Sequence, residues 1–293
     1  MKDLSFLTEE RLAVIENISG AIAGGNSFAK VEISDPKVTE GDIRRVIHRF
    51  DNKRHGPIAR IKSLIARRLA EKFTRKVNRY TSIVGVENAL SVRGGAIVTS
   101  NHYNPTDSTP VRMLAYAMDR RKKLHIIVQE KNIFMKGLFG FLMKNCNTHP
   151  VTSSPQYMMK SLEPKIREIL KSKGLLLIYP EQEMWFNYKK PRPTRDGAYH
   201  FAAKYGVPII PTFTEMVTLD GERDENGFLP IRHTLHVLPP IYPDKSLSIR
   251  ENRIIMQTKD YEMKKKLYEE IYGIPLTDDF DPARDIAGIM PSE

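Results

Sequence analysis

Residues 96–108, AIVTSNHYNPTDS, pass from an apolar run into a polar turn and on toward a helix. Ala96–Thr99 is uncharged and rich in β-branched side chains, which predicts a short buried strand. Pro105 disfavours helical backbone in the residue before it and favours a turn. His102 therefore comes just after a predicted buried strand, and Asp107 follows it by five residues.

Outward from this stretch, strand-like and helix-like segments alternate. Further strands are predicted at Leu124–Val128, Leu175–Tyr179 and Val207–Phe213. The second half of a helix is predicted at Pro164–Lys173, with Gly174 as its stop signal, and a further helix at Asp196–Tyr205, ended by Gly206. Thr234–Leu238 is expected to return antiparallel to the preceding strand. Such alternation is typical of an α/β fold with a mostly parallel central sheet flanked by helices.

Two other regions flank this one, which gives three regions: 1–80, 81–245 and 246–293. The first is predicted to be a basic, helical region. In the third, a helix is predicted over Ile249–Tyr272 that stops at Gly273. Its end, Thr277–Glu293, is acidic and contains proline, which predicts a surface tail.

The segment Pro57–Tyr80 has the clearest helical periodicity. Apolar residues recur every three or four positions, at Ile58, Ile61, Ile65, Leu69, Phe73, Val77 and Tyr80. Lysines and arginines occupy the other faces. Two interpretations stay open: a surface helix whose apolar stripe packs on the core, and a helix lying in the interface of an anionic bilayer.

The composition limits the kinds of partner and cellular location that we expect. A net charge of +11 implies an anionic partner, which leaves nucleic acid, an acidic membrane surface and a phosphorylated substrate. The single cysteine, Cys146, excludes an intramolecular disulfide and is expected to be buried. No run approaches the roughly 18 apolar residues of a spanning helix, and no signal-peptide core is found. We therefore expect a cytoplasmic protein that lies peripherally on the inner face of a membrane.

His102 and Asp107 are the strongest candidates for catalysis. Ligands of parallel sheets bind beyond the carboxyl ends of the strands, where His102 is expected. A carboxylate that accepts a hydrogen bond from Nδ1 fixes the imidazole tautomer and leaves Nε2 as a general base. The alternative is that Asp107 caps the helix that follows, Ser108–Met118.

Three further blocks follow this pair in order. They are Lys131–Gly140, the tetrapeptide Ile178-Tyr179-Pro180-Glu181, and Val207-Pro208-Ile209-Ile210-Pro211. Together with the His-x4-Asp spacing, they resemble the motifs of the glycerophospholipid acyltransferase family, which contains the lysophosphatidic acid acyltransferases. The resemblance extends over about residues 90 to 240.

The resemblance implies transfer of a fatty acyl group from a thioester donor, acyl-CoA or acyl-carrier protein, to a hydroxyl of a lysophospholipid-like acceptor. His102 would be the general base and Asp107 its orienting partner. It also implies that Lys131, Glu181, Gln182 and Pro211 contact substrate. No cofactor and no metal are expected. The expected partners are the lipid acceptor, the acyl donor and an anionic membrane surface.

The third block departs from the family pattern. Where the family has Gly-Thr-Arg after the glutamate, this chain has Gln182-Glu183-Met184. The missing arginine is the one linked to the acceptor phosphate. We predict that Arg192 or Arg195 takes over this role, because a guanidinium binds phosphate through two parallel hydrogen bonds. For Glu181, the alternative to substrate binding is a structural role, accepting hydrogen bonds from loop amides.

An inactive membrane-binding protein with the same fold, and an acyltransferase for a lipid without glycerol phosphate, both stay open. A nucleic-acid binder is not predicted, because no groove-reading motif appears. A metal hydrolase is not predicted either, since His102 and Asp107 lack an identifiable third ligand. His125 is expected to be a satisfied core or surface residue. No partner is identified for the other histidines weighed: His48, His55, His200, His233 and His236.

Overall fold

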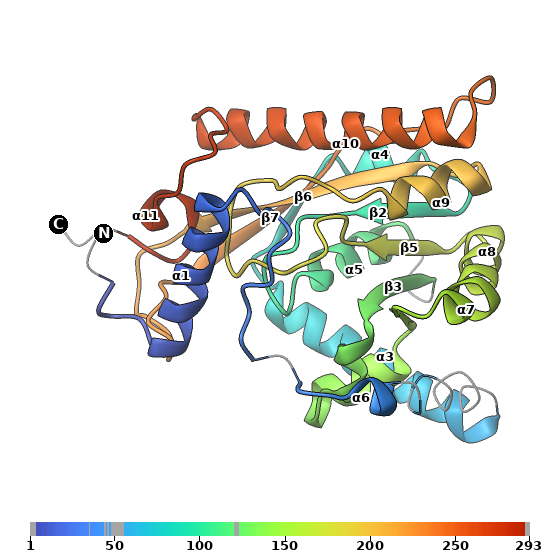
Figure 1. Cartoon of the computed structure of the whole chain (residues 1–293), viewed down its shortest axis with the longest axis horizontal. Coiled ribbons are helices and arrows are strands. Elements are labelled where there is room, and N and C mark those ends of the chain that lie inside the picture. The colour runs from blue at the N-terminus through green and yellow to red at the C-terminus, as the bar shows by residue number, and fades with distance from the viewer. Residues whose placement is uncertain are drawn as a thin grey trace.

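A central sheet organises the molecule. The computed structural model describes residues 4–34, 36–43, 45, 47, 56–119 and 123–290. Within these residues, seven strands form one sheet in the order β1-β7-β6-β2-β5-β3-β4 (Figure 1). Their bounds are β1 Ser82–Val84, β2 Ala96–Thr99, β3 Leu124–Gln129, β4 Thr148–Val151, β5 Leu175–Ile178, β6 Ile209–Thr218 and β7 Ile231–Val237.

The sheet is mostly parallel. Strands β4, β3, β5, β2 and β6 run in one direction, and β7 returns antiparallel to β6, as the sequence predicted. Edge strand β1 pairs parallel with β7. Strand β2 lies between β5 and β6, with Thr99 opposite Ile178 on one side and Pro211 on the other. The residues that follow β2 therefore emerge at the centre of the carboxyl edge, and the predicted fold class is confirmed.

Helices cover both faces of the sheet (Figure 1). Helices α4 and α5 contribute buried residues to one face, and α8, α9 and α10 to the other. The bounds are α1 Glu9–Ala23, α3 Pro57–Val77, α4 Val86–Leu90, α5 Ser108–Ala117, η1 Glu130–Phe134, α6 Gly137–Asn145, α7 Pro155–Tyr157, η2 Met158–Leu162, α8 Glu163–Lys171, α9 Gly197–Tyr205, α10 Ile249–Tyr272 and α11 Pro282–Asp285.

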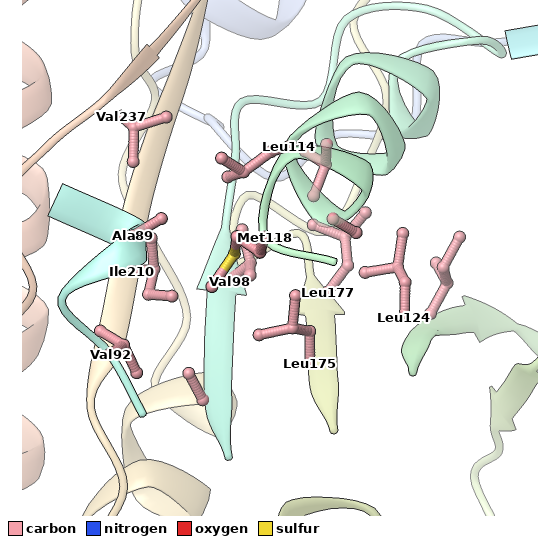
Figure 2. Close-up of a cluster of buried hydrophobic side chains, with 14 of the residues drawn as sticks. Ala89, Val92, Val98, Leu114, Met118, Leu124, Leu175, Leu177, Ile210 and Val237 are labelled. Carbon is pink, nitrogen blue, oxygen red and sulfur yellow. The ribbon is translucent and has the colours of Figure 1, made fainter. Parts of the chain in front are cut away.

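Strand alternation divides the core between the two faces. In β2, Ala96 and Val98 belong to the cluster under α5, whereas Ile97 belongs to the cluster under α9. Figure 2 shows the first cluster, in which Leu114 and Met118 meet the side chains of the sheet. The chain from β2 to α5 is thus fixed at both of its ends by buried apolar contacts.

Two helix boundaries illustrate how local signals act. Helix α10 begins and ends where predicted, with a capping box between Ser248 and Glu251 and a left-handed Gly273. The predicted second half of a helix, Pro164–Lys173, corresponds to α8, which runs from Glu163 to Lys171 and follows directly on α7 and η2. Its left-handed residue is Lys173, at φ 61°, and not Gly174. A Cβ on Gly174 would lie 2.7 Å from Ile169, so close approach explains this glycine.

A third apolar cluster joins segments that are far apart in sequence. Helix α1 contributes Val14 and Ile18, and the segment after Glu181 contributes Trp185. Ile286 and Ile289 join the same cluster from the end of the described chain. The prediction of a surface tail is therefore wrong for residues 282–290. Their apolar side chains are buried against partners that an acidic composition does not reveal.

Helix α3 leaves most of its predicted apolar stripe exposed. The packed face of α3 includes Ala66 and Ala70. They contact Leu142 of α6 and Cys146, which directly follows α6. In contrast, Ile58 is 68% exposed and Ile61 is 58% exposed. Cys146 is buried, as expected. Among the described residues, no helix is both long and apolar enough to cross a bilayer.

Candidate active site

The loop after β2 is held at its start by Asn101. This side chain accepts a hydrogen bond from the Thr214 amide (2.8 Å) and donates one to the Thr214 carbonyl oxygen (3.0 Å). It therefore pairs with β6 as a strand residue would, although the backbone has left the ladder. His102 follows at the carboxyl edge of the sheet.

His102 and Asp107 form a hydrogen-bonded pair. His102 Nδ1 lies 2.6 Å from Asp107 Oδ2, and the side chains are 22% and 4% exposed respectively. An Asx turn brings them together, since Asn104 Oδ1 accepts from both the amide and the hydroxyl of Thr106. Among the described residues, Nε2 of His102 has no hydrogen-bond partner. The Asp107 side chain makes no capping hydrogen bond to α5, so the helix-cap alternative is wrong.

Tyr179 completes this centre. Its hydroxyl donates to Asp107 Oδ1 (2.7 Å), and its ring stacks on His102 with centroids 4.2 Å apart and 18° between the planes. Burial and the Asp107 carboxylate raise the pKa of Tyr179 well above 10, so the phenol stays a proton donor. Asp107 Oδ2 also accepts from the Tyr103 amide (3.2 Å). Both carboxylate oxygens are thus fixed, and with them the imidazole.

Sequence reasoning missed Tyr179 as a site residue. It belongs to the third block, two residues before Glu181. Its hydroxyl was the available signal, because a buried phenol requires a hydrogen-bond acceptor.

Glu181 is buried behind the same loop. Its Oε2 accepts from the backbone amide of His102 (3.2 Å), and its Oε1 accepts from the backbone amide of Arg192 (3.1 Å). The guanidinium of Arg192 forms an ion pair with it at 3.2 Å. These contacts favour the structural interpretation of Glu181, in which it positions the backbone that carries the histidine.

The two predicted phosphate-binding arginines differ in their surroundings. Arg192 is 3% exposed, and its guanidinium donates to Glu181, to the Ser27 carbonyl oxygen (2.9 Å) and to the Glu183 carbonyl oxygen. These partners are internal, which counts against Arg192 as a phosphate ligand. Arg195 is exposed, and its guanidinium carbon lies 3.7 Å from the centre of the Phe28 ring.

The other predicted substrate contacts are spread around the carboxyl edge. Gln182 is exposed and has a left-handed backbone, with φ at 65°, where the family motif has glycine. Lys131 is half-buried in η1. Pro211 is buried inside β6 beside β2. Substrate contact by these three residues stays a prediction.

A supporting layer covers the loop that contains His102 and Asp107. The amide of Trp185 donates to the His102 carbonyl oxygen (3.0 Å), and the amide of Asn187 donates to the Tyr103 carbonyl oxygen (2.7 Å). Asn187 in turn accepts at its carbonyl oxygen from Ala287 (2.8 Å). The segment that departs from the family motif therefore holds the backbone of His102 and Tyr103.

The remaining histidines have mixed surroundings. His125 and His149 are hydrogen-bonded to each other at 2.9 Å, across β3 and β4. His236 pairs with Glu215 at 2.7 Å, and burial lowers the pKa of His233 to about 4. His200 packs edge-on to Phe201. His48 and His55 lie outside the described residues. Within the part of the chain that the structure describes, no group of three His, Cys, Asp or Glu residues could hold a metal ion.

Comparison with known proteins agrees with this geometry. Residues 81–215, which include the pair, Tyr179 and Glu181, match the family model described as Acyltransferase. The chain carries a domain of the acyltransferase family. A search of curated protein sequences finds no significant match.

The acyltransferase domain also has a structural relative. The chain is similar to the 1-acyl-sn-glycerophosphate (LPA) acyltransferase PlsC from Thermotoga maritima, with a TM-score of 0.50 and 16% sequence identity. The match covers 92% of this chain and 98% of that one. At this identity the likeness concerns the fold, which the two proteins share beyond the acyltransferase domain itself.

Proposed function

We propose that this protein transfers a fatty acyl group from a thioester donor to a hydroxyl of a lysophospholipid-like acceptor. The observation that carries the proposal is the His102–Asp107 pair at the carboxyl edge of the sheet, with Nε2 open and Nδ1 held. The match of residues 81–215 to the acyltransferase family supports the reaction type. Acyl-CoA and acyl-carrier protein are both suitable donors.

In the proposed reaction, Nε2 of His102 accepts the proton of the acceptor hydroxyl while that oxygen attacks the thioester carbonyl carbon. A tetrahedral intermediate forms and collapses with cleavage of the carbon–sulfur bond. The imidazolium then returns the proton to the departing thiolate. The products are the new ester and the free thiol, and no enzyme nucleophile is needed.

Asp107 stabilises the imidazolium that exists between the two proton transfers. A carboxylate in this position fixes the tautomer and the ring orientation, and its negative charge lowers the free energy of the charged intermediate. Glu181 acts indirectly, because it accepts a hydrogen bond from the backbone amide of His102. General-base catalysis of this kind contributes about 10²–10⁴-fold to a rate.

The test is acyl transfer by the purified full chain. A panel of lysolipids is offered with acyl-CoA or with acyl-carrier protein as the donor, and products are measured by mass spectrometry. We expect one ester product with wild type and at least a hundredfold slower reaction with His102→Ala. His200→Ala is the matched control and is expected to keep full activity. Equal rates for wild type and His102→Ala would contradict the catalytic role and favour an inactive protein with this fold.

We also propose that α3 docks on an anionic membrane. Its exposed apolar residues continue onto α6, where Phe139 contacts Phe73 edge-on with ring centroids 5.8 Å apart. Leu138 and Phe139 of α6 are 48% and 40% exposed. Exposed apolar side chains flanked by lysines and arginines suit the interface of an anionic bilayer better than bulk water.

Charge reversal tests this docking. Replacing Arg67, Arg68, Lys72 and Arg75 by Glu should reduce binding to vesicles that contain anionic lipid by several-fold or more, because each basic residue near such a surface contributes about 1 kcal/mol. The control reverses four basic residues elsewhere: Lys160, Lys171, Lys245 and Lys266. Both variants have the same net charge. Equal binding by the two variants would contradict a role for α3.

A further inference from the structure

Arg112 is a buried arginine without a partner. It lies on α5, five residues after Asp107, and is 7% exposed. Among the described residues it has no hydrogen-bond or ion-pair partner. The other buried cations do, since Lys190 pairs with Asp285, Arg192 with Glu181 and Lys264 with Asp260. Arg112 is therefore the exception among the buried cations of the described chain.

The guanidinium of Arg112 is a buried positive charge that no described carboxylate pairs with. Arginine keeps its proton in proteins, so burial cannot neutralise it. A buried charge without a counter-charge is unfavourable, and stable folds pair such groups or place them where a ligand or water reaches them. The surroundings of Arg112 should therefore accommodate an anion.

Arg112 lines a small cavity that is partly open to solvent. The cavity lies between α3, α5 and α6, and its wall is mainly apolar, with Phe73, Phe139 and Leu142 among its residues. Ser108 and Thr109 add hydroxyls that can donate to an anion. No carboxylate is among the described lining residues. One cation on an apolar wall suits a ligand that is itself amphipathic and anionic.

The cavity reaches the catalytic loop. Pro105 and Thr106, between the histidine and the aspartate, form part of its wall. Arg112 is also near enough to Tyr179 to act on its phenol. Burial and Asp107 raise the pKa of that phenol, and the charge of Arg112 opposes them. An anion bound here would lie beside the proposed reacting centre.

We propose that Arg112 binds a substrate phosphate and that the apolar wall of its cavity holds the adjoining hydrocarbon. The proposal rests on the function proposed above and names the group that substitutes for the missing third-block arginine. The phosphate belongs to the lipid acceptor or to the pantetheine arm of the donor, and the experiment separates these sources.

Direct binding is the first measurement. Calorimetry compares a short-chain monoacylglycerol phosphate with the same monoacylglycerol, and 4′-phosphopantetheine with pantetheine. For wild type, at least one phosphate compound should bind more tightly than its phosphate-free partner. Arg112→Met should weaken that compound by about 10- to 100-fold, the usual effect of losing charge-assisted hydrogen bonds, and leave its partner unchanged. Arg112→Lys should be intermediate, because the charge remains but the paired donors are lost.

Arg93→Met, at an exposed arginine between α4 and β2, is the matched control and should bind like wild type. If Arg112→Met weakens binding of the lipid phosphate alone, the acceptor is the source. If it weakens binding of 4′-phosphopantetheine alone, the donor is the source. Equal weakening of phosphate and phosphate-free compounds, or no weakening, would overturn the proposal. The proposal would also be overturned if the wild-type protein bound neither phosphate compound more tightly than its phosphate-free counterpart.

Thermal unfolding without ligand separates binding from folding. Because the guanidinium lacks a protein partner, Arg112→Met should leave Tm unchanged or raise it. A fall of more than about 4 °C would show that Arg112 serves the fold and would also overturn the proposal. These readouts need no turnover. A chain that keeps phosphate selectivity but transfers no acyl group would contradict the proposed reaction and leave the phosphate site in place.

Discussion

The His102–Asp107 centre and the Glu181–Arg195 segment make an instructive comparison. Both contain charged residues expected to handle substrate. In the first, the partners are five residues apart, and they leave Nε2 of His102 open. In the second, Arg192 is turned inward and bonded to Glu181 and to Ser27, which is distant in sequence. The first region presents its chemistry to the outside, and the second uses its charge to support the first.

The difference shows which charged groups near an active-site motif are available to substrate. A guanidinium near a predicted site is available to substrate only if the protein does not already surround it with acceptors. Arg192 has three internal acceptors, and Arg112, at similar burial, has none among the described residues. Burial and pairing together, and not distance from a motif, separate a structural cation from a binding one.

Asp107→Asn should give the largest effect. An amide cannot replace both carboxylate oxygens as acceptors, so either the histidine or one of the two tyrosine donors loses its partner. We expect kcat to fall by about 10³–10⁴-fold, as for loss of the orienting carboxylate in other histidine-based sites. Steady-state acyl transfer measures this. A loss smaller than tenfold would mean that the pair is not the catalytic centre.

Arg192→Ala should act on stability and not on acceptor affinity. It leaves the buried Glu181 carboxylate without its counter-charge, which costs about 3–5 kcal/mol in the free energy of unfolding. Arg195→Ala, on the surface, should stay within about 0.5 kcal/mol of wild type. Urea denaturation of both variants checks the contrast. If Arg192→Ala unfolds like wild type and instead loses acceptor affinity, the two regions share a binding role.

Much of this contrast lies beyond what a sequence shows. The strand–turn–helix around His102 was predictable because its determinants, the β-branched run, Pro105 and the acidic residue, are local. Strand β4 was missed because His149 and Pro150 weaken its pattern, which an edge strand tolerates. The partners of Arg192 depend on tertiary packing, and so does burial of Ile286 against Trp185. The sequence around Arg192 or Ile286 does not indicate these contacts.

Tyr179→Phe should have a smaller effect. It keeps the ring that stacks on His102 and removes only the hydrogen bond to Asp107, worth about 0.5–1.5 kcal/mol. We expect kcat to fall by no more than about tenfold. The same assay measures it, with Tyr205→Phe, on α9, as the control. A loss as large as that of Asp107→Asn would instead place the phenol in the chemical step.

Gln182→Gly should give the smallest change. Residue 182 has a left-handed backbone, which glycine adopts more readily than glutamine. Relief of this strain should stabilise the fold by up to about 1 kcal/mol, partly offset by the greater freedom of glycine in the unfolded chain. Urea denaturation measures it. If acyl transfer also falls severalfold, the Gln182 side chain contacts substrate, as the sequence predicted.

The hydrogen bond between Asn187 and Ala287 has a consequence for biosynthesis. On the ribosome, the strand–turn–helix around His102 emerges long before Ala287 is synthesised. Asn187, which braces the Tyr103 backbone, is tied in place only when that late segment docks. A nascent chain should therefore form its central sheet first and acquire a rigid catalytic loop last. The backbone around His102 would then become rigid only after the segment that contains Ala287 has been synthesised and has docked.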